Sequence, residues 1–252
     1  MLELKPHPIR VLMAWLVHAF TATAACAGMM TLINIYQHQY VAALWFMAIA
    51  VVIDAVDGTL ARMVHVKTVL PNIDGALLDN MVDYLNYVIT PCFFFYIKPD
   101  MLPTPYTIPL LITIIMTSAY QFCQIDAKTP DHFFKGFPCY WNIVLFYMFI
   151  FNTAALFNLL TLLILCILIF VPVKYVYPSR LDYLTESRPL KICMHVFSCI
   201  YGISSACLLW QYPDANSICV LLSLGYVVLY LSSSIYRTYY PMIKSRIIMH
   251  RA

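Results

Sequence analysis

Charged residues are scarce in this 252-residue chain: Asp, Glu, Lys and Arg make up 11% of it, while hydrophobic residues make up 62%. Soluble domains carry about 25% charged residues, so the composition excludes an ordinary soluble protein. The mean hydropathy is +0.78. Apolar runs of about 20 residues, each long enough to cross a bilayer, recur along the chain. Together these features indicate a polytopic membrane protein.

Other common features are missing as well. The nine cysteines are an odd number, form no CxxC motif and show no Cys/His zinc spacing, which argues against a disulfide framework or a structural zinc site. No basic patch exceeds what membrane topology explains, so nucleic acid is not an expected partner. We expect no cleavable signal peptide, because the first apolar stretch is too long for one and carries Arg10 and His18.

The apolar runs predict an all-α polytopic membrane bundle of about eight transmembrane helices, forming one domain over residues 1–252. The expected spans are 10–36, 40–62, 73–97, 103–123, 138–154, 157–177, 191–211 and 215–236. If the spans alternate from a cytoplasmic N-terminus, fourteen of the fifteen Lys and Arg residues fall on one side, and only Lys98 falls on the other. By the positive-inside rule, both termini are therefore expected in the cytoplasm.

Four aspartates interrupt two of these apolar segments. Asp54 and Asp57 lie in VIDAVDGTLAR, and Asp79 and Asp83 lie in IDGALLDNMVDYLNY. A carboxylate at membrane depth costs at least ~2.5–3.5 kcal/mol on insertion scales, so such residues usually serve a function. Both pairs are expected one to three helical turns inside the cytoplasmic boundary, on two antiparallel neighbouring helices.

Each aspartate pair lies on one helical face together with small residues. Read as helices, the first pair shares its face with Gly58 and Ala61, and the second pair shares its face with Gly75. Four carboxylates in one layer repel one another, and divalent cations that prefer oxygen ligands, such as Mg²⁺ or Mn²⁺, relieve that repulsion. The pattern predicts a metal site that a bulky phosphate ligand can approach.

The strings DAVDGTLAR and GALLDNMVD together resemble the D-x2-D-G-x2-A-R…G-x3-D-x3-D motif of the CDP-alcohol phosphotransferase family. All motif positions are filled, by Asp54, Asp57, Gly58, Ala61, Arg62, Gly75, Asp79 and Asp83. The spacer between Arg62 and Gly75 is longer than in most of the family. It resembles the bacterial branch that transfers a phosphatidyl group from CDP-diacylglycerol to choline. The segments TLARMVHVKTVLPN and KTPDHFFKGFPCYWN are similar to that branch too.

The resemblance implies that phosphatidylcholine and CMP are made from CDP-diacylglycerol and choline at the cytoplasmic side of a bacterial inner membrane. It also implies two divalent cations per active site, manganese or magnesium. Their expected ligands are Asp54, Asp57, Asp79 and Asp83. Asp83 would in addition act as general base on the acceptor hydroxyl, because it lies one turn deeper than Asp79.

Six residues are candidates for contact with the nucleotide or its phosphates. Gly58 and Ala61 lack bulk, and Arg62 can pair either with phosphate or with a neighbouring aspartate. Helix packing explains Gly75 equally well, and interhelical hydrogen bonding equally explains the two polar residues of the first span. The six are Gly58, Ala61, Arg62, Gly75, His18 and Thr21.

Choline carries a fixed positive charge, so its pocket is expected to present aromatic faces. Tyr87 is the leading candidate, because it lies one turn beyond Asp83 on the same face. The full set of candidates is Tyr87, Tyr84, Trp141 and Phe133, although interface belts or the core also account for aromatic residues in such a chain. Candidates for the lipid phosphate are Lys135, Arg180 and Arg188, which topology alone would also explain. Membrane lipid is an expected partner, and a homodimer is possible.

Two alternatives stay open from the sequence. The same chemistry could use another acceptor, such as inositol, serine or glycerol phosphate, although these would call for more Arg, Lys or Asn near Asp83. A non-enzymatic ion or proton transporter is a more distant alternative. It would need acidic groups accessible from both sides, but no acidic residue lies deep in the outer half of any span, and no inverted repeat is visible.

Overall fold

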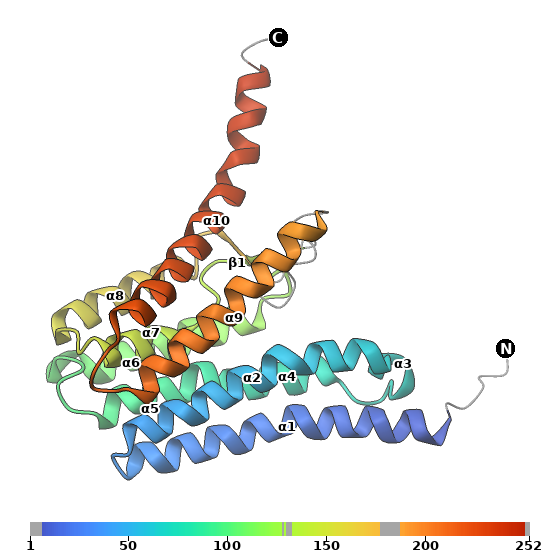
Figure 1. Cartoon of the computed structure of the whole chain (residues 1–252), viewed down its shortest axis with the longest axis horizontal. Coiled ribbons are helices and arrows are strands. Elements are labelled where there is room, and N and C mark those ends of the chain that lie inside the picture. Colours follow the sequence, from blue (N-terminus) through green and yellow to red (C-terminus); the bar gives the residue numbers. More distant parts are fainter. Residues whose placement is uncertain (1–6, 128, 130–132, 177–186, 250–252) are drawn as a thin grey trace.

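The computed structural model describes residues 7–127, 129, 133–176 and 187–249, and Figure 1 shows the whole chain. In these residues a bundle of helices carries one small antiparallel sheet, in which β1 pairs with β2. The elements in chain order are α1 (Pro8–Tyr36), α2 (Tyr40–Val64), α3 (Val66–Val69), α4 (Gly75–Tyr84), the π-helix η1 (Leu85–Ile89), α5 (Thr90–Ile97), α6 (Thr104–Cys123), β1 (Phe133–Lys135), α7 (Trp141–Ile150), α8 (Ala155–Leu168), β2 (Lys174–Val176), α9 (Arg188–Trp210) and α10 (Ser217–Met249). The prediction of a helical membrane bundle is confirmed.

Five helices in the described part of the chain are long and apolar enough to cross a membrane, namely α1, α2, α6, α9 and residues Ser217–Tyr239 of α10. The segments α4, η1 and α5 follow one another without a break over residues 75–97. At 1.5 Å per residue this run is about 34 Å long, which is also sufficient to span. The protein is therefore a multi-pass membrane protein, and its first four expected spans lie within two residues of the observed helices.

The predicted fifth and sixth spans are too long. α7 covers only Trp141–Ile150 and α8 only Ala155–Leu168. A helix of ten residues measures about 15 Å, half of a hydrocarbon core. After α8 the apolar chain leaves the helical conformation and pairs as β2 with β1, which the sequence pattern did not reveal. The count of eight spans is accordingly approximate.

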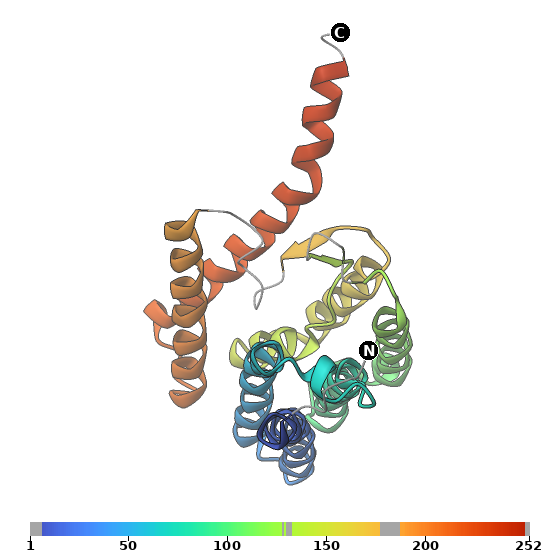
Figure 2. The same ribbon diagram turned by 90° about the vertical axis from the view of Figure 1, so that its right-hand side faces the viewer.

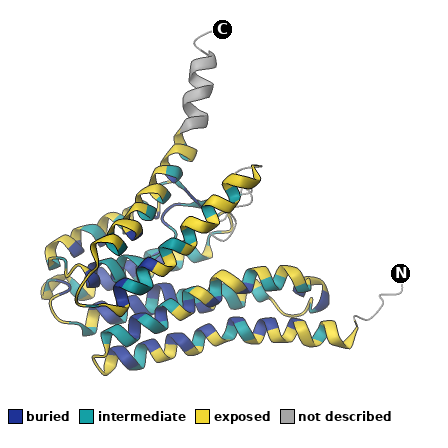
Figure 3. Ribbon diagram, in the orientation of Figure 1, coloured by how far each residue is buried: buried dark blue, intermediate teal, exposed yellow. Residues whose placement is uncertain are grey.

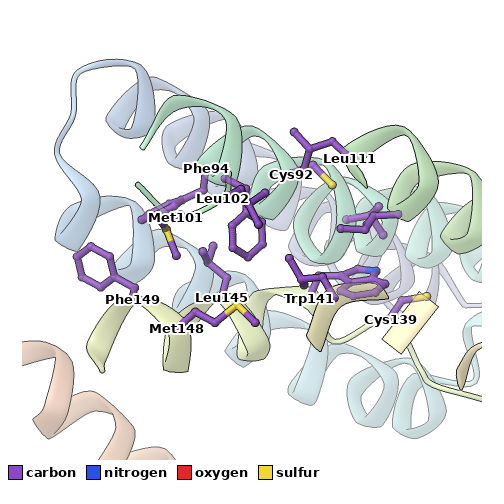
Figure 4. Close-up of a cluster of buried hydrophobic side chains, with 14 of the residues drawn as sticks. Cys92, Phe94, Met101, Leu102, Leu111, Cys139, Trp141, Leu145, Met148 and Phe149 are labelled. Atoms are coloured by element: carbon purple, nitrogen blue, oxygen red, sulfur yellow. The ribbon is translucent and has the colours of Figure 1, made fainter. Parts of the chain in front are cut away.

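The main hydrophobic core lies where α5, α6, α7 and α8 meet (Figures 3 and 4). Trp141 and Leu145 of α7 are fully buried there, together with Phe94 of α5. The indole Nε1 of Trp141 donates a hydrogen bond to Ser118 Oγ at 2.8 Å, which satisfies its only polar group. This bond ties the start of α7 to α6.

The helices α9 and α10 lie beside this bundle, and α10 extends away from it toward the C-terminus (Figure 2). Their contact with the rest of the chain is partly polar. Tyr147 of α7 is hydrogen-bonded to Ser223 of α10 at 2.5 Å, and the backbone N–H of Lys174 in β2 donates to Thr238 Oγ1 at 2.8 Å. These bonds tie α10 both to the bundle and to the edge of the sheet.

Candidate active site

The site forms where α2 ends and α4 begins, with α1 packed against both helices (Figure 1). α2 closes at His65, which takes a left-handed conformation with φ 55°. The chain then passes through α3 and restarts as a helix at Gly75. Asp74 caps this start, because its Oδ1 accepts hydrogen bonds from the N–H groups of Ala76 and Leu77, both at 3.0 Å. The cap fixes where the aspartates of α4 lie relative to those of α2.

Three of the four predicted aspartates converge. Carboxylate oxygens of Asp54, Asp57 and Asp79 all lie within 4.8 Å of one another. Asp57 is only 5% exposed, and the other two are half-buried. At this range two ionised carboxylates repel by roughly 3 kcal/mol at an effective dielectric constant near 20. An all-oxygen donor set of this kind fits Mg²⁺ or Mn²⁺, so these residues could hold a metal ion.

Asp83 stands apart from this group. It is half-buried, lies one helical turn beyond Asp79 on α4, and contributes no oxygen to the cluster of three. Tyr87, four residues further along the chain, lies one helical turn beyond it. The geometry thus separates a carboxylate cluster from a single carboxylate next to it, a difference that the regular motif spacing did not reveal.

Tyr87 contacts the cluster directly. Its hydroxyl donates a hydrogen bond of 2.6 Å to Asp54 Oδ2, between the π-helix η1 and α2. The side chain is 7% exposed, and its ring meets the Tyr140 ring edge to face, with 6.4 Å between centroids. From its spacing in the sequence, Tyr87 was expected on the helical face that carries Asp83. However, the hydrogen bond to Asp54 was not among the predicted site features.

Two residues of α1 border the same region. His18 and Thr21 are each 7% exposed. A Cβ added to Gly75 would lie 2.7 Å from Cε1 of His18, so the absence of a side chain there lets α1 and α4 approach. The Nε2 atom of His18 is buried without a hydrogen-bond partner in the structure. An unsatisfied imidazole nitrogen beside the motif glycine is a candidate contact for a polar ligand.

The remaining motif residues of α2 are accounted for by local contacts. Arg62 is exposed, and its Nη2 donates to Thr59 Oγ1 at 2.9 Å. Ala61 packs in a small apolar cluster between α1, α2 and α3. Gly58 faces open space, since a Cβ added to it would meet only the Arg62 guanidinium, at 3.4 Å. A ligand can therefore approach the α2 backbone at Gly58.

The other predicted aromatic candidates have structural contacts. The Tyr84 hydroxyl donates to the Ile115 carbonyl of α6 at 2.9 Å, and Trp141 lies in the core (Figure 4). Phe133 is 2% exposed, and its ring is contacted by the cations of Lys174 and Arg237, at 5.8 and 5.6 Å from its centroid. Nearby positive charges disfavour a quaternary ammonium group at Phe133, so Tyr87 is the remaining candidate.

The predicted lipid-phosphate candidates lie in different places. Lys135 forms an ion pair of 2.6 Å with Asp126. The hydrogen bond from Lys135, together with its charge, holds the pKa of the Asp126 carboxyl below its usual range. Arg188 is exposed at the start of α9, and Arg180 lies outside the described residues. The structure does not bring Lys135 and Arg188 together into one site.

The amino-acid sequence is similar to a described protein family and to several named proteins. A family model described as CDP-alcohol phosphatidyltransferase matches residues 14–174, a range that contains all four aspartates, Tyr87 and Tyr140. A protein of Legionella pneumophila named phosphatidylcholine synthase is 69% identical over 234 residues, covering 93% of this chain and 92% of that protein. Proteins of the same name from Borreliella burgdorferi and Pseudomonas aeruginosa are 36% and 34% identical, over 92% and 82% of this chain and 97% and 84% of their own length.

Proposed function

Because the chain belongs to the CDP-alcohol phosphatidyltransferase family, we propose that it transfers the phosphatidyl group of CDP-diacylglycerol to choline, giving phosphatidylcholine and CMP. The chain is a membrane enzyme, and phosphatidyl transfer is the chemistry of its relatives. The observation that carries the finer proposal is the convergence of Asp54, Asp57 and Asp79, with Asp83 one helical turn away. Relatives named phosphatidylcholine synthase support choline as the acceptor.

The three converging carboxylates are the proposed ligands of magnesium or manganese. When bound, such a cation neutralises phosphate charge and polarises the phosphoryl group. The chain's own part is to hold the three carboxylates in one place within a largely buried layer. Asp57, the most buried of them, has the strongest need for a counter-charge, because burial disfavours an uncompensated carboxylate.

Asp83 is the proposed general base. It takes the proton from the choline hydroxyl as the choline oxygen forms a bond to the phosphorus that carries diacylglycerol. The bond from that phosphorus to the oxygen of CMP breaks, and CMP leaves with the electron pair. A base needs to reach the attacking hydroxyl and to accept its proton. A carboxylate outside the group of three is better suited to this role than one inside it.

The nucleotide half of the substrate is proposed to lie against α1, α2 and α4. Gly58 leaves room at the α2 backbone, and the buried Nε2 of His18 offers an otherwise unsatisfied hydrogen-bonding group. Thr21 lies one turn from His18 on α1 and is equally buried. Arg62, at the end of α2, can turn from Thr59 toward a phosphate, because it is exposed. Gly75 has no side chain, which allows His18 of α1 to pack against the start of α4.

Choline is proposed to bind beside Tyr87 and Tyr140. Their rings are in contact, and Tyr87 lies one helical turn beyond Asp83, so an ammonium group there would place the hydroxyl near the base. Inositol, serine or glycerol phosphate would need polar or cationic partners in place of these rings. The active site is further proposed to face the cytoplasm of a bacterial inner membrane, because the distribution of Lys and Arg favours that orientation.

The test is CMP release by the full chain purified in detergent. CDP-diacylglycerol, Mg²⁺ or Mn²⁺ and choline should give CMP and phosphatidylcholine in equal amounts. Replacing choline by inositol, serine or glycerol phosphate should give little product. Efficient product formation with one of these and none with choline would leave the family assignment standing and reject choline as the acceptor.

A further inference from the structure

The side chain of Tyr87 donates a hydrogen bond to the carboxylate cluster. Its hydroxyl lies 2.6 Å from Asp54 Oδ2, a short distance that is typical of a hydroxyl donating to a charged acceptor. The two residues are on different helices, η1 and α2, and are separated by 33 positions in the chain. The bond therefore joins the two helices that carry the aspartates.

The surroundings hold Tyr87 in this position. The side chain is 7% exposed, and its ring packs edge to face on Tyr140. The helix is locally a π-helix over Leu85–Ile89, between the regular helices α4 and α5. A π-turn holds one more residue than an α-turn, so it changes the direction in which the following side chains point, and such turns are frequent at functional sites. Here it sets the direction of Tyr87.

We infer that Tyr87 is a positioning residue for the metal site through its hydroxyl, in addition to the contact with choline proposed for its ring. The inference rests on the proposed function, because it takes Asp54 to be a metal ligand. A ligating carboxylate that accepts a hydrogen bond on one oxygen is fixed in rotation, and its other oxygen is aimed at the ion. Tyr87 supplies that bond from η1, with its side chain buried away from water.

The inference changes the effect expected for Tyr87→Phe. If Tyr87 served only as an aromatic face, Tyr87→Phe would be nearly silent, because phenylalanine retains the ring. As a positioning residue, Tyr87→Phe removes the single atom that matters. Loss of such an outer hydrogen bond typically lowers metal affinity by 10–100-fold. The matched control is Tyr147→Phe, which also removes a hydroxyl that bonds across helices, to Ser223, but lies on α7 away from the aspartates.

The experiment measures Mn²⁺ binding to the full-length protein in detergent, without substrates, from the electron paramagnetic resonance signal of free Mn²⁺. We expect Tyr87→Phe to raise the dissociation constant about tenfold or more, and Tyr147→Phe to leave it at the wild-type value. In an Asp54→Ala background, Tyr87→Phe should have no further effect, because its acceptor is gone. An unchanged dissociation constant in Tyr87→Phe, or an equal change in Tyr147→Phe, overturns the inference.

A second measurement covers the case in which Tyr87→Phe does not fold. Incorporation of 3-fluorotyrosine at position 87 keeps both the ring and the hydroxyl. Its ¹⁹F resonance should shift when diamagnetic Mg²⁺ is added, whereas the same label at position 147 should not respond. A resonance at position 87 that ignores Mg²⁺ overturns the inference. Both readouts are independent of turnover, so a wild-type enzyme that fails to use choline would refute the proposed acceptor and leave this result intact.

Discussion

At the scale of single residues, Asp57 supplies the main physical reason for the proposed cation. It is 5% exposed and lies within 4.8 Å of two further carboxylates. The neighbouring carboxylates repel that of Asp57 when all are charged, and a divalent cation bound between them offsets this repulsion. The folded state should therefore be destabilised by the cluster when the metal is absent and stabilised by it when the metal is present.

Asp57→Asn should separate these two effects. In a chelator, we expect the variant to unfold at a higher temperature than the wild type, because one of the repelling charges is gone. With Mn²⁺ at 100 times its dissociation constant, the wild type should gain ~2.7 kcal/mol from binding to the folded state, and the variant should gain much less. Thermal unfolding in detergent, with EDTA or with Mn²⁺, shows whether the order of stability of the two proteins changes between the two conditions. A variant that is less stable in both conditions would contradict a metal-compensated cluster.

Asp83→Asn tests whether Asp83 acts as the general base or as a metal ligand. Asparagine keeps the shape of the side chain and one acceptor oxygen but cannot take up the proton. We expect Mn²⁺ affinity to stay close to the wild-type value while CMP release falls by roughly 10²-fold or more, the scale of general-base catalysis. Titration of Mn²⁺ alongside steady-state kinetics checks both. Lost metal affinity with turnover restored at high metal would make Asp83 a ligand instead.

At the scale of elements, the sequence predicted the long helices well and the short ones badly. α1, α2 and α6 carry sustained apolar runs that end at polar turns, so their limits could be read directly. Residues 169–176 continue the apolar run but leave α8, and residues 174–176 form β2, because a short apolar stretch fits a buried strand as well as a helix. Pairing with β1 favours the strand over the helix, and the hydropathy of the segment does not reveal that pairing.

In the site, too, features set by local spacing could be predicted and features set by tertiary contacts could not. Spacing alone was enough to find the aspartates, because residues three and four apart share a helical face. The bond between Tyr87 and Asp54 joins residues 33 positions apart and depends on the π-helix, whose register no local pattern encodes. Phe133 and Trp141 were plausible by type, but their contacts with Lys174, Arg237 and Ser118 follow from tertiary packing.

Gly136 is the critical residue in the connection between β1 and α7. Its φ is +79°, and a Cβ there would lie 2.1 Å from the Ile169 carbonyl oxygen, just after α8. Gly136→Ala should therefore lower the free energy of unfolding by about 2 kcal/mol or more, through backbone strain and overpacking. Gly202→Ala is the matched control, because Gly202 lies within α9 and a Cβ there meets nothing within 4 Å.

The control should be neutral or stabilising by up to about 1 kcal/mol, as expected for Gly to Ala inside a helix. Equal unfolding temperatures for the two variants would mean that the connection between β1 and α7 adopts another conformation in the membrane. The measurement is thermal unfolding in detergent, where both variants can be compared with the wild type at one lipid-to-protein ratio.

At the scale of the whole molecule, the three converging aspartates lie toward one end of the bundle. Asp54 and Asp57 precede the end of α2 at Val64, and Asp79 follows the start of α4 at Gly75. That end also carries Arg62 and Lys67, whereas the opposite end carries Lys98 alone among the expected outer loops. If cationic loops face the cytoplasm, the aspartates open toward the cytoplasm as well.

Fusions to reporters test this orientation. Green fluorescent protein, which fluoresces in the cytoplasm, and alkaline phosphatase, which is active only after export, can each be joined after His38, Pro71 and Asp100. We expect phosphatase activity after His38 and Asp100 and fluorescence after Pro71, because Arg62 and Lys67 retain their loop inside. Replacing Arg62 and Lys67 by glutamine should weaken that preference, since positive charge near span ends sets the orientation. Fluorescence after His38 with phosphatase activity after Pro71 would invert the topology and put the carboxylate cluster on the exported side.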